Sequence, residues 1–178
     1  MRTHSGEHPR MGCVDVCPFV PITGTSMELC VEIAQRVAQN IGELGVPVFM
    51  YGGAASDPSR TSLSTLRKGE YEELVNRFNG NSTIHDESTC LPDFGATEWN
   101  EVAQRSGSIT IGAREILIAY NVNVDEKDAM ISKQIGSIVR SSGRLIKSSD
   151  KSKKFRTHGL LSHVQGTVSY THLRAHET

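Results

Sequence analysis

A helix pattern between two apolar strand patterns is the feature that most constrains the fold. Residues 25–45 carry apolar side chains at helical spacing, namely Cys30, Ile33, Val37, Ile41 and Leu44. Thr25 with Glu28 matches a capping box, and Gly45 predicts where the helix ends. Short apolar strands are predicted on either side, over residues 13–20 and 46–53. Strand, helix and strand in this order favour a helix that crosses over a sheet.

Further elements are predicted along the rest of the chain. Residues 62–79 have one apolar face interrupted by Gly69, which predicts a broken or two-part helix, and residues 79–100 read as a polar loop. Residues 108–124 alternate as a half-buried strand does, at Ile116, Ile118, Tyr120 and Val122. Residues 125–143 predict a helix that packs on the same sheet, with Ile131, Ile135, Ile138 and Val139 inward. The predicted class is α+β, a mixed sheet covered by helices, with an α/β sandwich as the alternative.

Composition excludes several classes of protein. The 178 residues suffice for one ordinary domain, and 37% hydrophobic with 22% charged residues is a globular composition. Nineteen Lys and Arg balance twenty Asp and Glu, so the protein has no overall positive charge that would attract the phosphate backbone of a nucleic acid. No nucleic-acid partner is therefore expected. The chain has no apolar run long enough to cross a bilayer and no secretory segment, so no membrane partner and a cytoplasmic location are expected.

The four cysteines raise the question of a zinc site. Cys13, Cys17 and Cys30 have nearly the spacing of the first three ligands of a zinc finger. The fourth ligand would fall near Ala34, and no histidine lies between His8 and His85, so the tetrahedron cannot close. No metal is therefore expected, and the cysteines are expected to be reduced, with Cys13 and Cys17 as core thiols on a strand.

Several blocks of sequence carry a family resemblance, in one order along the chain. They read "GEHPRMGCVDVCPFVPITGTSMELC", "LGVPVFMYGGAA", "LRKGEYEEL", "PDFGATEWN" and "GSITIGAREILIAYNVNV". They resemble the glutamate formiminotransferase (formimidoyltransferase-cyclodeaminase) family, specifically the N-terminal subdomain of its transferase domain, over roughly residues 2–146. Several ordered blocks are a far more specific signal than one motif.

The resemblance implies a fold, a reaction and a site. The fold is ferredoxin-like, and the reaction, part of histidine degradation and one-carbon metabolism, transfers a formimino group from N-formiminoglutamate to tetrahydrofolate, giving 5-formiminotetrahydrofolate and glutamate. Tetrahydrofolate is then a co-substrate. The family's catalytic histidine lies in "EHPRMG", which is His8 here, and its folate-contacting loop follows "PDFG". That loop maps onto Gly95, Ala96, Thr97, Glu98, Trp99, Asn100, Glu101, Val102, Ala103, Gln104, Arg105, Ser106 and Gly107.

Side-chain chemistry is consistent with these positions and leaves some alternatives open. An imidazole with a pKa near 6.5 can accept and return a proton at neutral pH, and Pro9 stiffens the backbone beside His8. Arg10 could contact a substrate carboxylate or form an ordinary salt bridge. Trp99 could stack on the pterin ring or anchor the loop in the core. Gly95 and Gly107 allow either close approach of a ligand or a backbone with positive φ.

The resemblance also divides the chain. Residues 1–146 are expected to form part of the N-terminal subdomain, 147–158 a basic linker and 159–167 the start of the C-terminal subdomain. Residues 168–178 resemble a translated sequencing adapter and are expected not to be native. The chain is thus expected to be truncated at both ends, to lack the C-terminal subdomain and to be inactive alone. The full-length protein is expected to be able to form a homodimer. The alternative function is a noncatalytic folate-binding or interaction remnant.

Overall fold

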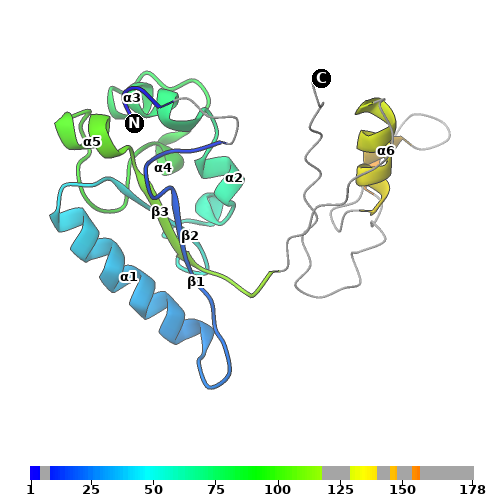
Figure 1. The fold of residues 1–178 in the computed structure, drawn as a ribbon, viewed down its shortest axis with the longest axis horizontal. Helices are drawn as coiled ribbons and strands as arrows, with labels where there is room; N and C mark the ends of the chain where they lie inside the picture. The colour runs from blue at the N-terminus through cyan, green and yellow to red at the C-terminus, as the bar shows by residue number, and fades with distance from the viewer. Residues whose placement is uncertain (5–8, 118–128, 140–144, 148–153, 157–178) are drawn as a thin grey trace. The chain divides into compact units, whose positions relative to one another are not determined.

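The computed structural model describes residues 1–4, 9–117, 129–139, 145–147 and 154–156 (Figure 1). His8 lies outside the described residues, as do Ile118, Tyr120 and Val122 of the predicted strand. The chain forms two compact units, Met1–Glu115 and Ile116–Thr178. No helix in the described part of the chain is long and apolar enough to span a membrane.

The first unit is built on a small parallel sheet. Its strands are β1 (Val16–Phe19), β2 (Val48–Gly52) and β3 (Ile109–Ala113), and β3 lies between the other two. Cys17 and Met50 both pair with Ile111, which fixes the register on the two sides of β3. The α+β class is confirmed. The described strands of this sheet are all parallel, so the antiparallel member that a mixed sheet requires is not among them.

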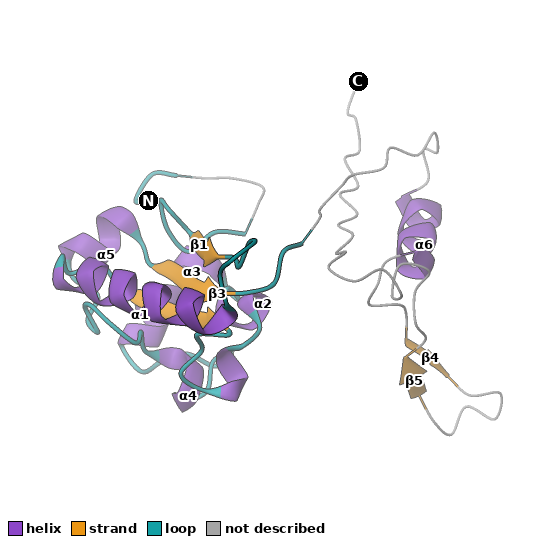
Figure 2. Ribbon diagram, turned by 90° about the horizontal axis from the view of Figure 1, so that it is seen from below, coloured by secondary structure: helices purple, strands orange, loops and turns teal. Residues whose placement is uncertain are grey.

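Helix α1 (Met27–Glu43) joins β1 to β2, which confirms the predicted crossover. Figure 2 shows it lying across one face of the sheet. The predicted capping box is wrong by one residue, because Ser26 is the N-cap and its Oγ accepts a hydrogen bond from Leu29 N at 3.2 Å. The helix ends before Gly45, whose φ is +81°, as predicted. Leu44 is 74% exposed, because it follows the last helical turn and does not extend the apolar face.

Apolar side chains alternate between the two faces of the sheet, as a strand geometry requires. On β2, Val48 and Met50 face α1, whereas Phe49 and Tyr51 face the opposite side. The core against α1 comprises Cys30, Ala34, Ala38, Val48, Met50, Ala54, Ile109, Ile111 and Ala113. The second core comprises Met11, Phe49, Tyr51, Leu66 and Leu74. The sheet is therefore covered on both faces, which parallel sheets generally require.

Short helices cover the second face. They are η1 (Pro58–Arg60), α2 (Leu63–Leu66), α3 (Glu70–Phe78), α4 (Glu87–Cys90) and α5 (Glu101–Ser106). The predicted break in residues 62–79 is confirmed, because α2 and α3 are separated at Gly69, which has a φ of +78°. Helix α4 lies in the polar loop predicted over residues 79–100, and α5 lies in the predicted folate loop, residues 95–107. Both are capped by side chains, Asp86 for α4 and Asn100 for α5.

The second unit contains α6 (Ala129–Val139) and an antiparallel pair, β4 (Leu145–Lys147) with β5 (Lys154–Arg156). The strand predicted over 108–124 is too long, because β3 ends at Ala113 and residues 114–117 have no strand structure. Within this unit Ile131, Ile135 and Ile138 of α6 are 42–43% exposed and Val139 is half-buried. The sheet that these side chains were predicted to face belongs to the first unit, so their inward orientation stays a prediction. Strand β5 lies inside the stretch suggested as a basic linker.

Candidate functional site

The segment that follows His8, residues 9–13, is held by hydrogen bonds to the backbone carbonyls of three consecutive residues. An Arg67 guanidinium nitrogen donates to the carbonyl oxygen of Pro9, and Tyr71 N donates to Arg10 O at 2.8 Å. Met11 is fully buried, and its carbonyl accepts a hydrogen bond from Ser108 N at 2.9 Å. His8 itself lies outside the described residues, but the chain beside it is fixed to α3 and to the start of β3.

Arg10 is paired with two carboxylates of the α3 N-terminus. Its guanidinium lies 2.7 Å from Glu72 Oε1 and 2.9 Å from Glu70 Oε2, and its side chain is only 12% exposed. The hydrogen bond to Glu72 raises the pKa of Arg10, and the same bond lowers the pKa of Glu72. Of the two alternatives for Arg10, the structure therefore contains the salt bridge. A substrate carboxylate would have to compete with both glutamates, so the substrate contact stays a prediction.

The predicted folate loop begins and ends at glycines that pack against the chain itself. Gly95 has a φ of +84°, and a Cβ there would lie 2.0 Å from Val46 O. Gly107 has a φ of +70°, and a Cβ there would lie 2.1 Å from Met11 O. The positive-φ reason therefore applies at both glycines, and the close neighbour of each is backbone of this chain, whereas close approach of a ligand stays a prediction. Between them, α5 is capped by Asn100, whose Oδ1 accepts from Ala103 N at 2.9 Å.

Trp99 anchors the loop in the second core. Its ring centroid lies 5.5 Å from that of Tyr71 and 6.1 Å from that of Phe78, in tilted arrangements typical of aromatic pairs. The side chain is half-buried among these residues. The core-anchor alternative for Trp99 thus describes its present contacts, and stacking on a pterin ring stays a prediction.

The structure brings the two predicted site segments together. Gly12 forms an isolated antiparallel bridge with Gly107, and Cys13 N donates to Ser106 O at 2.8 Å. The N-terminal amino group also donates to Arg105 O at 2.5 Å. The segment precedes β1 and the loop precedes β3, so both lie at the amino ends of adjacent parallel strands. The two segments are far apart in the sequence, and only the sheet makes them neighbours.

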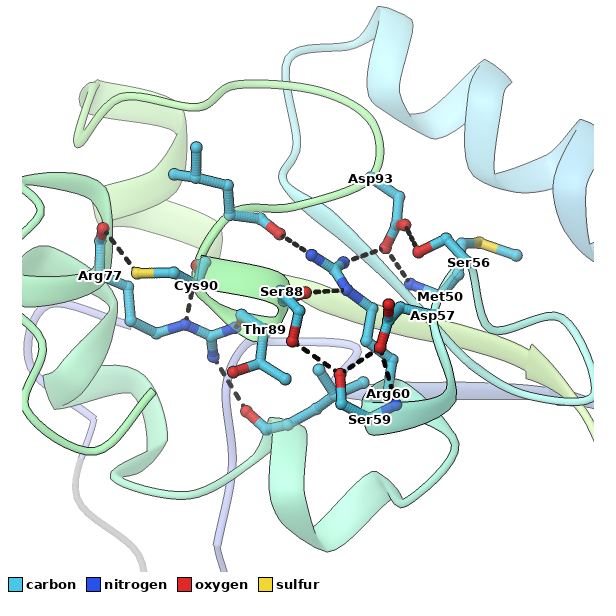
Figure 3. A network of polar contacts seen from close by, with 12 residues as sticks. Met50, Ser56, Asp57, Ser59, Arg60, Arg77, Ser88, Thr89, Cys90 and Asp93 are labelled. Carbon is cyan, nitrogen blue, oxygen red and sulfur yellow. Dashed lines mark hydrogen bonds and ion pairs between the residues drawn. The ribbon is translucent and has the colours of Figure 1, made fainter. Parts of the chain in front are cut away.

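Figure 3 shows a buried polar network that sequence analysis missed. Asp93, in the "PDFG" block, accepts hydrogen bonds from Met50 N at 2.7 Å and from Arg60 Nη1 at 2.6 Å, while the Ser56 hydroxyl donates to its other oxygen. Arg60 also donates to the carbonyls of Ser88 and Leu91. Asp93 therefore fixes the start of the predicted folate loop to strand β2.

Arg77 is a second buried arginine in Figure 3. Its guanidinium lies 4.2 Å from the Phe49 ring centroid and donates to the carbonyls of Leu66, Thr89 and Cys90. Burial lowers its pKa to about 10. One sequence signal could have found it: Arg77 follows Leu74 by three residues and so shares the apolar face of α3.

The cysteines do not all lie where they were expected. Cys13 is exposed and precedes β1, so its assignment as a core thiol on a strand is wrong. Cys17 lies on β1 and is half-buried, and burial raises its pKa. Within the described ranges, no three His, Cys, Asp or Glu side chains form a group that could hold a metal ion.

The largest groove among the pockets described lies away from the two site segments. It has a volume of about 810 Å³ and runs between α1 and the turn after β2, with Gln39, Ser56 and Asp93 in its lining. Residues 9–13 and 95–107 do not line it. It shares only the Asp93 region with the predicted site.

Comparison with known proteins supports the sequence resemblance. The family described as "Formiminotransferase domain, N-terminal subdomain" matches residues 1–114. The chain is 41% identical over 144 residues to a glutamate formimidoyltransferase of Streptococcus pyogenes serotype M1, covering 80% of this chain and 45% of that protein. It is 46% identical over 125 residues to a formimidoyltransferase-cyclodeaminase of Gallus gallus, covering 70% of this chain and 21% of that protein.

A parallel sheet with helices on both faces, and two loops joined at its amino edge, define the class as an α+β domain with a candidate ligand site. The chain belongs to the formiminotransferase family, within the N-terminal subdomain of its domain. It spans less than half the length of both the Streptococcus pyogenes and the Gallus gallus relative.

Proposed function

We propose that this chain is part of an enzyme that transfers a formimino group from N-formiminoglutamate to tetrahydrofolate and releases glutamate. Family membership supports transfer of the formimino group. One structural observation carries the assignment of the site: the Gly12–Gly107 bridge places the segment after His8 beside the loop expected to contact folate. A histidine acting on a folate nitrogen requires that proximity.

In the proposed reaction, His8 moves a proton between two nitrogens. A ring amine of tetrahydrofolate attacks the formimino carbon and forms a tetrahedral intermediate. The His8 imidazole accepts the proton lost by the attacking nitrogen and gives it to the glutamate nitrogen as the bond from carbon to that nitrogen breaks. The formimino group is then on the folate, glutamate has left as an amine, and the imidazole is neutral again.

The loop at 95–107 is proposed to contact the tetrahydrofolate co-substrate. Its two ends are fixed by Gly95 and Gly107, and its start is tied to β2 through Asp93. Fixed ends keep a binding loop close to one conformation, which lowers the ordering cost of ligand binding. No metal takes part in the proposal.

The test is a chimera in which residues 1–114 replace the matching segment of the Streptococcus pyogenes relative. We expect His8→Ala to lower the kcat of formimino transfer by about 100-fold or more, since general acid–base catalysis contributes typically 10²–10⁴-fold. The control is His4→Ala, an exposed histidine four residues earlier whose ring accepts a hydrogen bond from Arg10. Because Arg10 keeps its ion pairs with Glu70 and Glu72, this variant should keep kcat within about twofold. Unchanged kcat in His8→Ala would contradict the proposed role.

The 178-residue chain should be assayed in parallel. We expect little or no turnover from it, because a chain that spans less than half the length of its relatives presents only part of a site shared between subdomains and cannot preorganise its contacts. Tetrahydrofolate binding without turnover, in both the chain and the chimera, would instead support the noncatalytic folate-binding alternative.

A further inference from the structure

An arginine and an aspartate that no resemblance assigns to the site hold the residues next to His8. Arg67 follows α2, and one of its guanidinium nitrogens contacts both the carbonyl oxygen of Pro9 and, at 2.5 Å, Asp15 Oδ2. The side chains of Arg67 and Asp15 are 23% and 22% exposed, so solvent screens this pair less than a surface pair.

All three oxygens of Asp15 accept hydrogen bonds. Its Oδ1 accepts from Met11 N at 2.7 Å, and its Oδ2 accepts from Arg67. Its carbonyl oxygen accepts from Thr110 N at 2.7 Å and from Thr110 Oγ1 at 2.6 Å. The residue adopts a φ of +48°, an uncommon conformation that persists where the surroundings determine it. Asp15 thereby links the segment before β1 to the middle strand of the sheet.

We propose that Arg67 and Asp15 act as positioning residues that fix residues 9–11 and, through them, orient the catalytic histidine. This inference rests on the proposed role of His8. The physical reason lies in the backbone of Pro9: its ring locks φ, and the hydrogen bond from Arg67 to its carbonyl restrains ψ. With both dihedrals restrained, Pro9 keeps one conformation relative to Arg10. The hydrogen bond from Met11 N to Asp15 Oδ1 likewise restrains the backbone two residues after Pro9.

A rival explanation is that burial of Met11 alone holds the segment, with Arg67 and Asp15 adding only general stability. The two explanations differ in what Arg67→Met should do. Loss of the clamp formed by Arg67 and Asp15 should loosen residues 9–11 and misplace His8, whereas loss of general stability acts on the whole unit alike.

The experiment compares R67M, R67K and D15N with R36M, a matched control at an exposed arginine of α1. Amide hydrogen exchange is measured in the full 178-residue chain. We expect R67M and D15N to speed exchange of the Met11 amide, which donates to Asp15, and of the Tyr71 amide, which donates to Arg10 O, by about tenfold or more. Exchange at Ile111 in β3 should change less than twofold. The control R36M should change neither region.

Turnover is measured in the chimera with the relative. We expect R67M to lower kcat about 100-fold with KM for both substrates within about twofold, since a displacement of about 1 Å can cost that much. R67K, which retains one charged donor, should recover part of the loss. A merely structural role would not separate kcat from KM or respond to lysine.

The two hypotheses fail in distinguishable ways. If His8→Ala leaves turnover intact, the proposed function is wrong. Hydrogen exchange in R67M still tests whether Arg67 and Asp15 fix residues 9–11. If turnover depends on His8 but R67M leaves kcat and the exchange of Met11 and Tyr71 unchanged, the positioning role of Arg67 and Asp15 is overturned. Exchange that rises equally at Ile111 and at Met11 also overturns it, because the effect is then global.

Discussion

Individual residues at the site are held mainly by backbone constraints. Gly95 and Gly107 sit where any side chain would meet a carbonyl of the neighbouring segment. Sequence analysis identified both glycines as loop boundaries, yet it could not tell a ligand from the chain's own backbone as the close neighbour. Arg10 shows the same limit, because its pairing with Glu70 and Glu72 depends on a helix that lies far along the chain.

A glycine substitution tests the close contact at Gly95. Gly95→Ala should lower the free energy of unfolding by about 3 kcal/mol or more, since it combines strain at positive φ with a clash against Val46 O. Gly80→Ala is the matched control: its φ is +69° but no atom lies within 4 Å of the new Cβ, so about 1 kcal/mol is expected. Urea unfolding measures both. Equal losses would show that the close approach to Val46 is not important.

The elements of the first unit follow their local signals closely, and the discrepancies occur at boundaries. Helix α1 and strand β2 lie within their predicted ranges, and Gly69 separates α2 from α3. The start of α1 was misplaced because Thr25 and Ser26 are both good caps, and only the backbone at Ser26 is extended with its Oγ on Leu29 N. Helices α4 and α5 were missed because each is too short to show a period.

A pair of substitutions tests the cap. Ser26→Ala should lower the free energy of unfolding by about 1 kcal/mol, because Leu29 N loses its side-chain acceptor. Thr25→Ala, the neighbouring position, should change it by less than about 0.5 kcal/mol. Chemical denaturation of both variants provides the measurement. A larger loss from Thr25→Ala than from Ser26→Ala would restore the capping box that the sequence suggested.

At the scale of the whole molecule, buried polar groups tie the short helices to the sheet. Arg60, Arg77 and Asp93 connect η1, α3, α4 and β2 through hydrogen bonds to backbone carbonyls and amides. His85 belongs to the same region, with Nε2 within 2.8 Å of Lys68 O and Nδ1 within 3.3 Å of Thr89 Oγ1. Burial, with Arg77 nearby, lowers the pKa of His85.

That shift predicts a pH dependence of stability. Because the folded pKa of His85 lies below the unfolded value of about 6.5, the unfolded chain binds more protons in the window beneath 6.5. The contribution to stability is present above that value and is lost as pH falls. Urea unfolding between pH 7 and pH 5 should show a falling free energy of unfolding, with a shallower fall in His85→Gln. Identical slopes in the two proteins would contradict this.

Local sequence patterns were sufficient to predict the α+β class, the crossover helix between two strands, the break at Gly69 and membership of the formiminotransferase family. These depend on side-chain periodicity and on ordered motifs, which are local. The bridge between Gly12 and Gly107, the hydrogen bond from Met50 N to Asp93 and the contacts of Arg67 with Pro9 and Asp15 depend on the folded chain and could not be predicted from sequence patterns. Those contacts join residues far apart in the chain, and insertion of β3 between β1 and β2 is what brings several of them within hydrogen-bonding distance.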